Sequence, residues 1–250
     1  MAHLIPLSEG SFTVDKTKTF NPFNPETDDL QQRPQGSLLV EVQPFLLETA
    51  DDYLLFDAGL GFDLRPGTAQ LHHNLSVHGI RPEAITKVLM SHLHKDHASG
   101  CIRKDASGKL VLSLPEATYY VSANELDYAR QHVGSSYQQD LVDTLTHHPQ
   151  VTLLGESGTL DGGIRYQHSG GHCPYHQVFW IEDEQGVYFY GGDEAPQLSQ
   201  LQRRFRAKYD FDGQKGMELR QQYLDAGKRE GWTFLFYHDI QTPFFRFEES

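Results

Sequence analysis

Apolar residues along the chain gather in short runs separated by turn-forming residues, a pattern typical of β-strands. The turn-like stretch 50–52 separates two of these runs and predicts a hairpin. We predict strands over 38–48, 53–57, 87–91, 118–121, 151–154, 163–167, 177–181, 187–190 and 233–237.

Helical patterns lie between these strands. Ser122, followed three positions later by Glu125, has the form of a capping box and marks the start of a helix. We predict helices over 69–78, 122–133, 137–147, 197–208 and 216–229. Because strands and helices are interspersed without a clear linker or repeat, we expect one α/β (α+β) domain over 1–250.

The segment 21–36 carries three prolines and is predicted to be irregular. We therefore treat 1–37 as an N-terminal arm and 38–250 as the catalytic sandwich. The arm could act as a lid, a dimer contact or a surface wrap, and the sequence leaves these alternatives open.

Composition narrows the functional classes. The net charge of −13 argues against nucleic-acid binding, and the densest basic stretch, 203–208, is interpreted as the solvated face of a helix. Two cysteines cannot form a disulfide framework. Residues 1–10 lack a signal-peptide pattern, and no uncharged apolar run is long enough to span a membrane. We expect a cytoplasmic protein that acts on a small-molecule substrate, without nucleic-acid or membrane partners.

Four side chains of metal-ligand type are crowded into one loop directly after the strand 87–91. His92, His94, Asp96 and His97 have the form HxHxDH. Imidazoles two positions apart can converge on one cation, and the Asp-His pair can face a second. The alternative is a solvent-exposed histidine-rich turn.

Three further ligand-type residues lie at the ends of later predicted strands. His172 is in a glycine-rich loop between two strands, Asp193 follows the strand 187–190, and His238 follows the strand 233–237. Because a sheet holds its strand ends rigidly, such positions suit metal ligands. They favour a metal centre over an exposed turn.

These seven residues, in this order, resemble the metal-binding pattern of the metallo-β-lactamase-fold hydrolases. Asp57-Ala58-Gly59 is similar to the first motif of that family, so the resemblance covers about residues 38–240. It implies a four-layer αβ/βα sandwich with a dinuclear site at one edge of the packed sheets. The ligands it implies are His92, His94 and His172 for one ion, Asp96, His97 and His238 for the other, and Asp193 as a bridge between them.

The resemblance also implies the chemistry. We expect two zinc ions per chain, with manganese or iron as alternatives, and a metal-bridging hydroxide as the nucleophile. Asp96 or Asp193 would take up or return the proton. Asp57 would orient a ligand loop, and His176 matches a family position near the site, although a packing role suits it equally.

Within the family, the pattern is nearest to the lactonase-type members, including quorum-quenching lactonases. These enzymes carry a tyrosine where this chain has Pro196, so Tyr175 and Tyr237 are candidates for the phenol donor. The leading hypothesis is hydrolysis of an ester or lactone. A phosphodiesterase or phosphotriesterase of the same fold is one alternative, and a non-catalytic metal-binding protein is another.

Aromatic residues near both chain ends have two interpretations. We favour hydrophobic anchoring of the termini, with a substrate pocket or a homodimer contact as the alternative. These residues are Phe20, Phe23, Phe244, Phe245 and Phe247.

Overall fold

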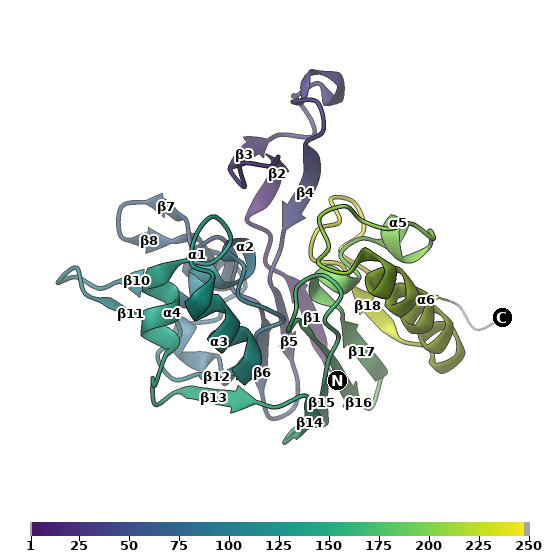
Figure 1. Cartoon of the computed structure of the whole chain (residues 1–250). Coiled ribbons are helices and arrows are strands. Elements are labelled where there is room, and N and C mark those ends of the chain that lie inside the picture. The colour runs from purple at the N-terminus through teal and green to yellow at the C-terminus, as the bar shows by residue number, and fades with distance from the viewer. Residues whose placement is uncertain (1, 248–250) are drawn as a thin grey trace.

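Two six-stranded β-sheets form the centre of the molecule, as shown by the computed structural model, which describes residues 2–247 (Figure 1). In the first sheet, the first two pairs of neighbouring strands are antiparallel, and the other three pairs are parallel. In spatial order this sheet contains β1 (His3–Pro6), β5 (Phe45–Glu48), β6 (Tyr53–Phe56), β9 (Lys87–Leu89), β12 (Thr118–Ser122) and β13 (Val151–Leu154).

The second sheet is mostly antiparallel, and only its β17–β18 pair is parallel. In spatial order it contains β14 (Ser157–Leu160), β15 (Ile164–His168), β16 (Gln177–Asp183), β17 (Gly186–Tyr190), β18 (Thr233–Leu235) and β19 (Phe244–Arg246). The two mixed sheets confirm the α/β class expected from the sequence.

Helices cover the outer face of each sheet, which completes the four layers (Figure 1). Apolar side chains of the first sheet pack against α1 (Gln70–Val77), α3 (Ala123–Gln131) and α4 (Gln139–Leu145). The second sheet packs against α6 (Gly213–Glu230), where Tyr223 and Leu224 meet Trp180. The αβ/βα sandwich is therefore confirmed.

The central strands of each sheet bury the side chains of both faces, and their sequences are therefore continuous apolar runs. In β6, Leu55 packs toward the helices, whereas Leu54 and Phe56 pack between the sheets. The ring of Phe56 lies 5.0 Å from that of Tyr190 in the opposite sheet. Contacts of this kind hold the two sheets together.

The segment 21–36 is irregular as expected beyond residue 23, apart from the 3-10 turn Leu30–Gln32, but the N-terminal arm also contains β-strands. β1 pairs antiparallel with β5 as the edge of the first sheet. A separate three-stranded sheet of β2 (Gly10–Val14), β3 (Phe20–Phe23) and β4 (Leu38–Val42) projects from the body (Figure 1). The expected strand 38–48 is divided between β4 and β5, and the division falls at Pro44, which has no N–H to donate to a ladder.

The expected helix 197–208 is wrong beyond its first turn, because only α5 (Leu198–Leu201) is helical. The carbonyl of Phe205 accepts a hydrogen bond from Arg220 of α6 at 3.1 Å instead of continuing a helix. In contrast, the expected N-cap is confirmed, because Ser122 caps α3 by accepting the amide of Glu125. The other half of the capping box is replaced, since the Glu125 carboxylate accepts the Leu93 amide at 3.2 Å.

The remaining elements are short, and none of the helices in the described part of the chain has the length and apolar character that a bilayer span requires. They are α2 (Lys95–Ala98), β7 (Asp63–Arg65), β8 (Thr68–Ala69), β10 (Ile102–Lys104), β11 (Leu110–Leu112) and the 3-10 turns Leu30–Gln32, Pro82–Ala84, Ser99–Cys101 and Gly192–Glu194.

Candidate metal centre

The histidine loop follows β9, where the parallel strands of the first sheet end. Asp57 lies directly after the neighbouring strand β6, and its amide donates to Leu89 at 3.1 Å. His94 is the N-cap of α2, and its carbonyl accepts the amide of His97 at 3.0 Å. This single helical turn divides the ligand-type side chains of the loop into two pairs.

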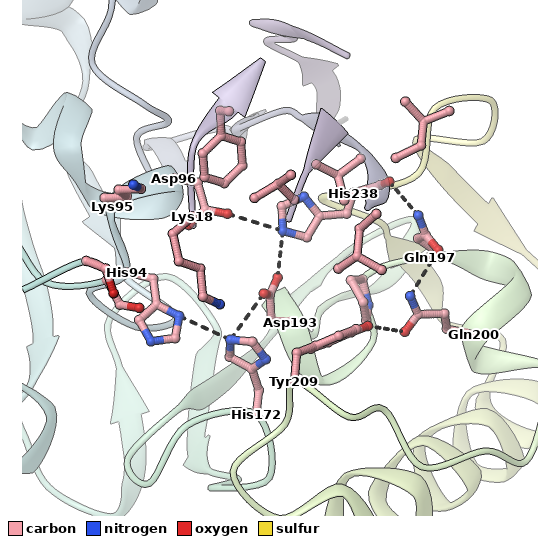
Figure 2. A pocket seen from close by; sticks show the side chains of 18 residues that line it. Lys18, His94, Lys95, Asp96, His172, Asp193, Gln197, Gln200, Tyr209 and His238 are labelled. Atoms are coloured by element: carbon pink, nitrogen blue, oxygen red, sulfur yellow. Dashed lines mark hydrogen bonds and ion pairs between the residues drawn. The ribbon is translucent and has the colours of Figure 1, made fainter. Parts of the chain in front are cut away.

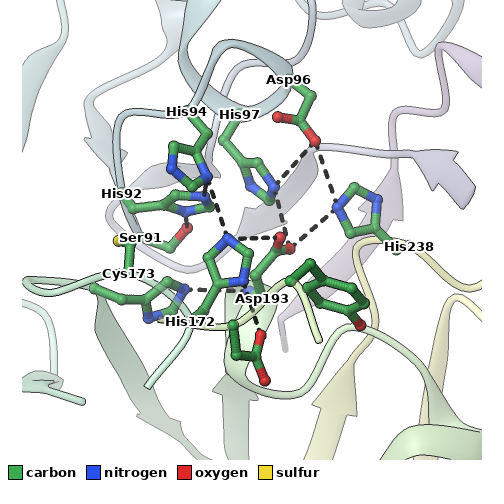
Figure 3. A network of polar contacts seen from close by, with 12 residues as sticks. Ser91, His92, His94, Asp96, His97, His172, Cys173, Asp193 and His238 are labelled. Carbon is green, nitrogen blue, oxygen red and sulfur yellow. Dashed lines mark hydrogen bonds and ion pairs between the residues drawn. The ribbon is translucent and has the colours of Figure 1, made fainter. Parts of the chain in front are cut away.

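The first pair is joined by a histidine from the second sheet. His92 Nε2 lies 3.0 Å from His94 Nδ1, and His172 Nε2 lies 3.2 Å from the same nitrogen (Figure 3). The ligand atoms of these three residues all lie within 4.8 Å of one another. Three imidazole nitrogens thus converge on one point.

The second pair is joined by His238, which follows β18. Its Nε2 lies 3.5 Å from Asp96 Oδ2, and His97 Nε2 lies 3.6 Å from the same oxygen. These three ligand atoms also lie within 4.8 Å of one another. Two separate groups of three donors therefore lie side by side (Figure 3).

Asp193 lies between the two groups, with one carboxylate oxygen toward each. Its Oδ2 is 3.3 Å from His172 Nε2 in the first group. Its Oδ1 is 3.1 Å from both His97 Nε2 and His238 Nε2 in the second. The structure therefore brings together all seven residues that the sequence singled out.

The donor set fits a metal centre. Two buried atoms, His97 Nε2 and Asp193 Oδ1, face each other without a hydrogen bond to any other described residue. Buried polar atoms rarely lack partners, and converging lone pairs repel unless a cation lies among them. Imidazole and carboxylate donors in this number suit zinc and related divalent ions.

Hydrogen bonds on the far side of the rings hold the imidazoles in place. Each bond uses the ring nitrogen that points away from the cluster, which leaves the other nitrogen free as a ligand. The bonds join His97 Nδ1 to Asp57 Oδ2 (2.7 Å), His238 Nδ1 to the Glu41 carbonyl (2.6 Å), His172 Nδ1 to Asp210 Oδ1 (3.2 Å) and His92 Nδ1 to Ser91 Oγ (3.0 Å).

Asp57 is the centre of the network behind the second group. It accepts the Ser91 amide at 2.7 Å, the Ser91 hydroxyl at 2.6 Å and the Tyr190 hydroxyl, in addition to its contact with His97. Its own backbone is left-handed, with φ of 55°. A fully buried carboxylate with this many donors is placed to orient the ligand loop, which is the role that the family resemblance implies.

His176 positions Asp193 from below. Its Nε2 accepts the Asp193 amide at 3.1 Å, and its Nδ1 pairs with Ser169 Oγ at 2.9 Å. Gly192 has a φ of 47°, and a Cβ there would come within 2.8 Å of the His176 ring. Only glycine therefore fits between this ring and Ser91.

The expected phenol donors do not face the pocket. Tyr237 donates its hydroxyl to the Asp96 carbonyl at 2.6 Å, and its ring stacks on His97 with centroids 4.1 Å apart. Tyr175 lies against His168. The tyrosine that does line the pocket is Tyr209, whose hydroxyl donates to Gln200 at 3.0 Å. The expectation for Tyr175 and Tyr237 as phenol donors is corrected accordingly.

Sequence reasoning missed two carboxylates that support His172. Asp210 contacts its ring, and Glu194 accepts its amide at 3.0 Å and that of Gly171 at 2.6 Å. Glu194 directly follows Asp193, and its position next to a predicted ligand could have identified it as part of the site. Asp210 lies two residues after the predicted helix 197–208, and no sequence pattern marks it as part of the site.

A pocket opens above the two groups (Figure 2). One wall is apolar and comes from β2, β4 and the start of β3, including Val14, Phe20 and Val40. Polar side chains, including those of Gln197 and Gln200, line another part of the pocket. Phe20 therefore belongs to the pocket rather than to a terminal anchor, whereas Phe247 packs against the second sheet.

The electrostatics of the cluster favour positive charge at its centre. Burial lowers the pKa of His92, His94 and His176, which keeps these imidazoles neutral. Burial alone raises the pKa of Asp193, but the imidazoles of His97, His172 and His238 together hold it well below its usual range. Burial also acts to lower the pKa of His97 and His172, but nearby carboxylates, chiefly that of Asp193, outweigh it and raise the pKa of both. A divalent ion bound here would take the place of the protons on these imidazoles.

The layered sheets and the clustered donors define a two-sheet α/β metallohydrolase. The model of the metallo-β-lactamase superfamily matches residues 40–238, and the chain belongs to this family. It is thus a metal-dependent hydrolase of that superfamily. No curated protein matches the sequence.

Solved structures share the whole fold. A probable metal-dependent hydrolase from Staphylococcus aureus has a TM-score of 0.80 at 21% identity, over 100% of this chain and 93% of that one. AidC, a dizinc quorum-quenching lactonase in complex with a product, has a TM-score of 0.73 at 18% identity, over 100% and 95%. A quorum-quenching N-acyl homoserine lactone lactonase has a TM-score of 0.68 at 20% identity, over 96% and 92%. At sequence identities of 18% to 21%, these similarities show a shared fold only.

Proposed function

We propose that the chain is a dinuclear zinc hydrolase that cleaves an ester or lactone bond. The observation that carries the proposal is the position of Asp193, whose two oxygens face two separate groups of donors. One ion would be held by His92, His94 and His172, the other by Asp96, His97 and His238, with Asp193 shared between them.

With both ions bound, the centre would supply a hydroxide nucleophile near neutral pH and a Lewis acid for the scissile carbonyl. The protein's own groups do the remaining work. Asp96 and Asp193 both line the pocket, where a carboxylate can take up a proton and return it to the leaving oxygen. Tyr209 lines the same pocket and can orient the substrate through its hydroxyl.

Two features support a carboxylic ester or lactone as the scissile group. The apolar wall formed by β2, β3 and β4 suits an acyl chain, since it offers Val14, Phe20 and Val40 beside the donors. Two of the structures that share the fold are quorum-quenching lactonases. A phosphodiester is the alternative substrate, since its charge would lie against the same metal centre.

The test combines turnover with metal content. Zinc-loaded protein is assayed against a panel of lactones and carboxylic esters and, separately, against aryl phosphodiesters. We expect ester or lactone hydrolysis together with about two zinc ions per chain. Turnover confined to phosphodiesters would overturn the substrate assignment. Less than about one ion per chain, in protein never exposed to chelator, would overturn the dinuclear assignment.

Asp193→Ala tests the bridge directly. We expect it to reduce bound zinc to one ion or fewer and kcat/KM by about 100-fold or more, because both groups lose a shared donor. Asp127→Ala is the matched control, since that carboxylate lies on α3 with 70% of its side chain exposed. Full turnover and two bound ions in Asp193→Ala would refute the bridging role.

A further inference from the structure

Lys18 reaches into the space above the metal centre, yet the proposed centre does not use it. It belongs to the turn between β2 and β3 and lines the main pocket together with His94 and His172 (Figure 2). It also lines an adjoining hollow, which shares both histidines and extends to Tyr128 and Phe211. Its side chain therefore stands where two cavities meet over the ligands.

The Lys18 ammonium has no counter-ion among residues 2–247. Among residues 2–247, the ion pairs within 4.0 Å that involve lysine or arginine belong to Lys87, Arg130, Arg220 and Arg229. The other lysine of the pocket, Lys95, lies 5.8 Å from the centre of the Phe20 ring. Lys18 thus presents a positive charge that no described carboxylate neutralises.

The backbone at Lys18 has a conformation that favours glycine. Its φ is 59°, in the left-handed region, where a side chain costs free energy. Asp15 holds the turn in this form, because its carbonyl accepts the Lys18 amide at 3.0 Å and its carboxylate accepts the Thr17 amide at 2.9 Å. A lysine kept at a strained position facing a pocket points to a use for that side chain.

We propose that Lys18 is a specificity-determining residue that binds a carboxylate on the substrate, away from the scissile bond. This inference rests on the proposed function and narrows it to esters or lactones that carry a negative charge. Lys18 has no carboxylate partner among residues 2–247, so an anionic group on the substrate would supply the missing counter-ion. Ser135 and Ser136 line the same two cavities and add polar surface beside it.

Two esters with the same carbon chain isolate the effect of the charge. The p-nitrophenyl ester of pentanoate is neutral, whereas the p-nitrophenyl monoester of glutarate has a terminal carboxylate. We expect the zinc-loaded protein to prefer the glutarate ester in kcat/KM by about tenfold or more. Lys18→Met should abolish that preference, mainly by raising KM for the glutarate ester. Lys18→Arg should keep most of the preference.

Lys16→Met is the control, because Lys16 is exposed on the same turn and lines neither cavity. Equal losses on both esters in Lys18→Met, or an unchanged preference, would overturn the proposal.

Ligand binding tests the same residue without turnover. Calorimetry compares the affinities of glutarate and pentanoate for the zinc-loaded protein, so that any binding through the shared carboxylate cancels. We expect Lys18→Met to reduce the glutarate-to-pentanoate affinity ratio about tenfold, and added salt to reduce it in the wild type. An unchanged ratio in Lys18→Met would refute the carboxylate site. If the affinity ratio depends on Lys18 but the protein hydrolyses no ester, the carboxylate site stands and only the proposed reaction is refuted.

Lys18→Gly separates function from folding. Because glycine accepts the left-handed conformation, we expect its Tm to rise while its preference for the glutarate ester is lost. A raised Tm with the preference intact would show that the side chain has no part in recognition.

Discussion

Replacing Glu9 by glutamine should stabilise the protein at about pH 8 far more than at about pH 5. Glu9 is only 7% exposed, and its Oε2 accepts the Leu60 amide at 2.7 Å. Its Oε1 has no hydrogen-bond partner among the described residues. Burial raises the pKa of this carboxyl to about 7, and the Leu60 amide offsets only part of that effect.

The direction of this pH effect depends on which state of the protein, folded or unfolded, binds the Glu9 proton more tightly. The pKa of Glu9 is higher in the folded state, so the folded protein is favoured below the unfolded value of 4.5 and loses that advantage as the pH rises through about 7. At about 1.4 kcal/mol per pKa unit, the loss is ~3 kcal/mol at pH 8 and ~1 kcal/mol at pH 5. Glutamine has no proton to lose, so the stability difference between Glu9→Gln and wild type should grow by ~2 kcal/mol between these pH values.

Urea denaturation of the zinc-loaded proteins at both pH values, followed by tryptophan fluorescence, measures this growth. Comparing the two proteins at each pH cancels any stability that both lose with bound metal, and it also cancels the pH-independent cost of burying the amide. Glu26→Gln, at an exposed position of the same N-terminal segment, is the control. Stability curves of Glu9→Gln and wild type that run parallel within ~0.5 kcal/mol would refute the reasoning.

Two further substitutions test the support behind the ligands. Asp57→Asn weakens the 2.7 Å contact that holds the His97 ring, so zinc affinity, measured by competition with a chelating dye, should fall about 10- to 100-fold. Unaltered affinity would contradict the orienting role. Gly100→Ala would place a Cβ 1.9 Å from the Ala58 carbonyl oxygen and should cost about 3 kcal/mol or more in urea denaturation. Gly155→Ala, where no atom lies within 4 Å of the added carbon, should change stability by less than ~0.5 kcal/mol.

The loop at the metal centre could be recognised from sequence because its geometry is local. The spacing from His92 to His97 needs only a strand end and one helical turn to separate two pairs of donors. His172, Asp193 and His238 were accessible for a related reason, since each follows a recognisable strand. A ligand at a strand end is positioned by the sheet whatever the rest of the chain does.

Other parts of the site depend on residues with no local pattern. Asp210 reaches the His172 ring only because the expected helix 197–208 stops at Leu201 and the chain turns back. Tyr209 enters the pocket through the same turn. Helix propensity in that stretch is overridden by Arg220, which takes a carbonyl that a helix would have used.

The sequence by itself determined the α/β fold class and the candidate metal ligands, because hydrophobic periodicity and ligand spacing act over a few neighbouring residues. Only the tertiary structure decided what surrounds them. β1 pairs with β5, and the sheet of β2, β3 and β4 places Val14, Lys18 and Phe20 in the pocket over the candidate metal ligands. Glu9 is buried against Leu60 by the same packing. Such contacts join segments far apart in the chain, so their free energy depends on the assembled sheets and not on any short stretch of sequence.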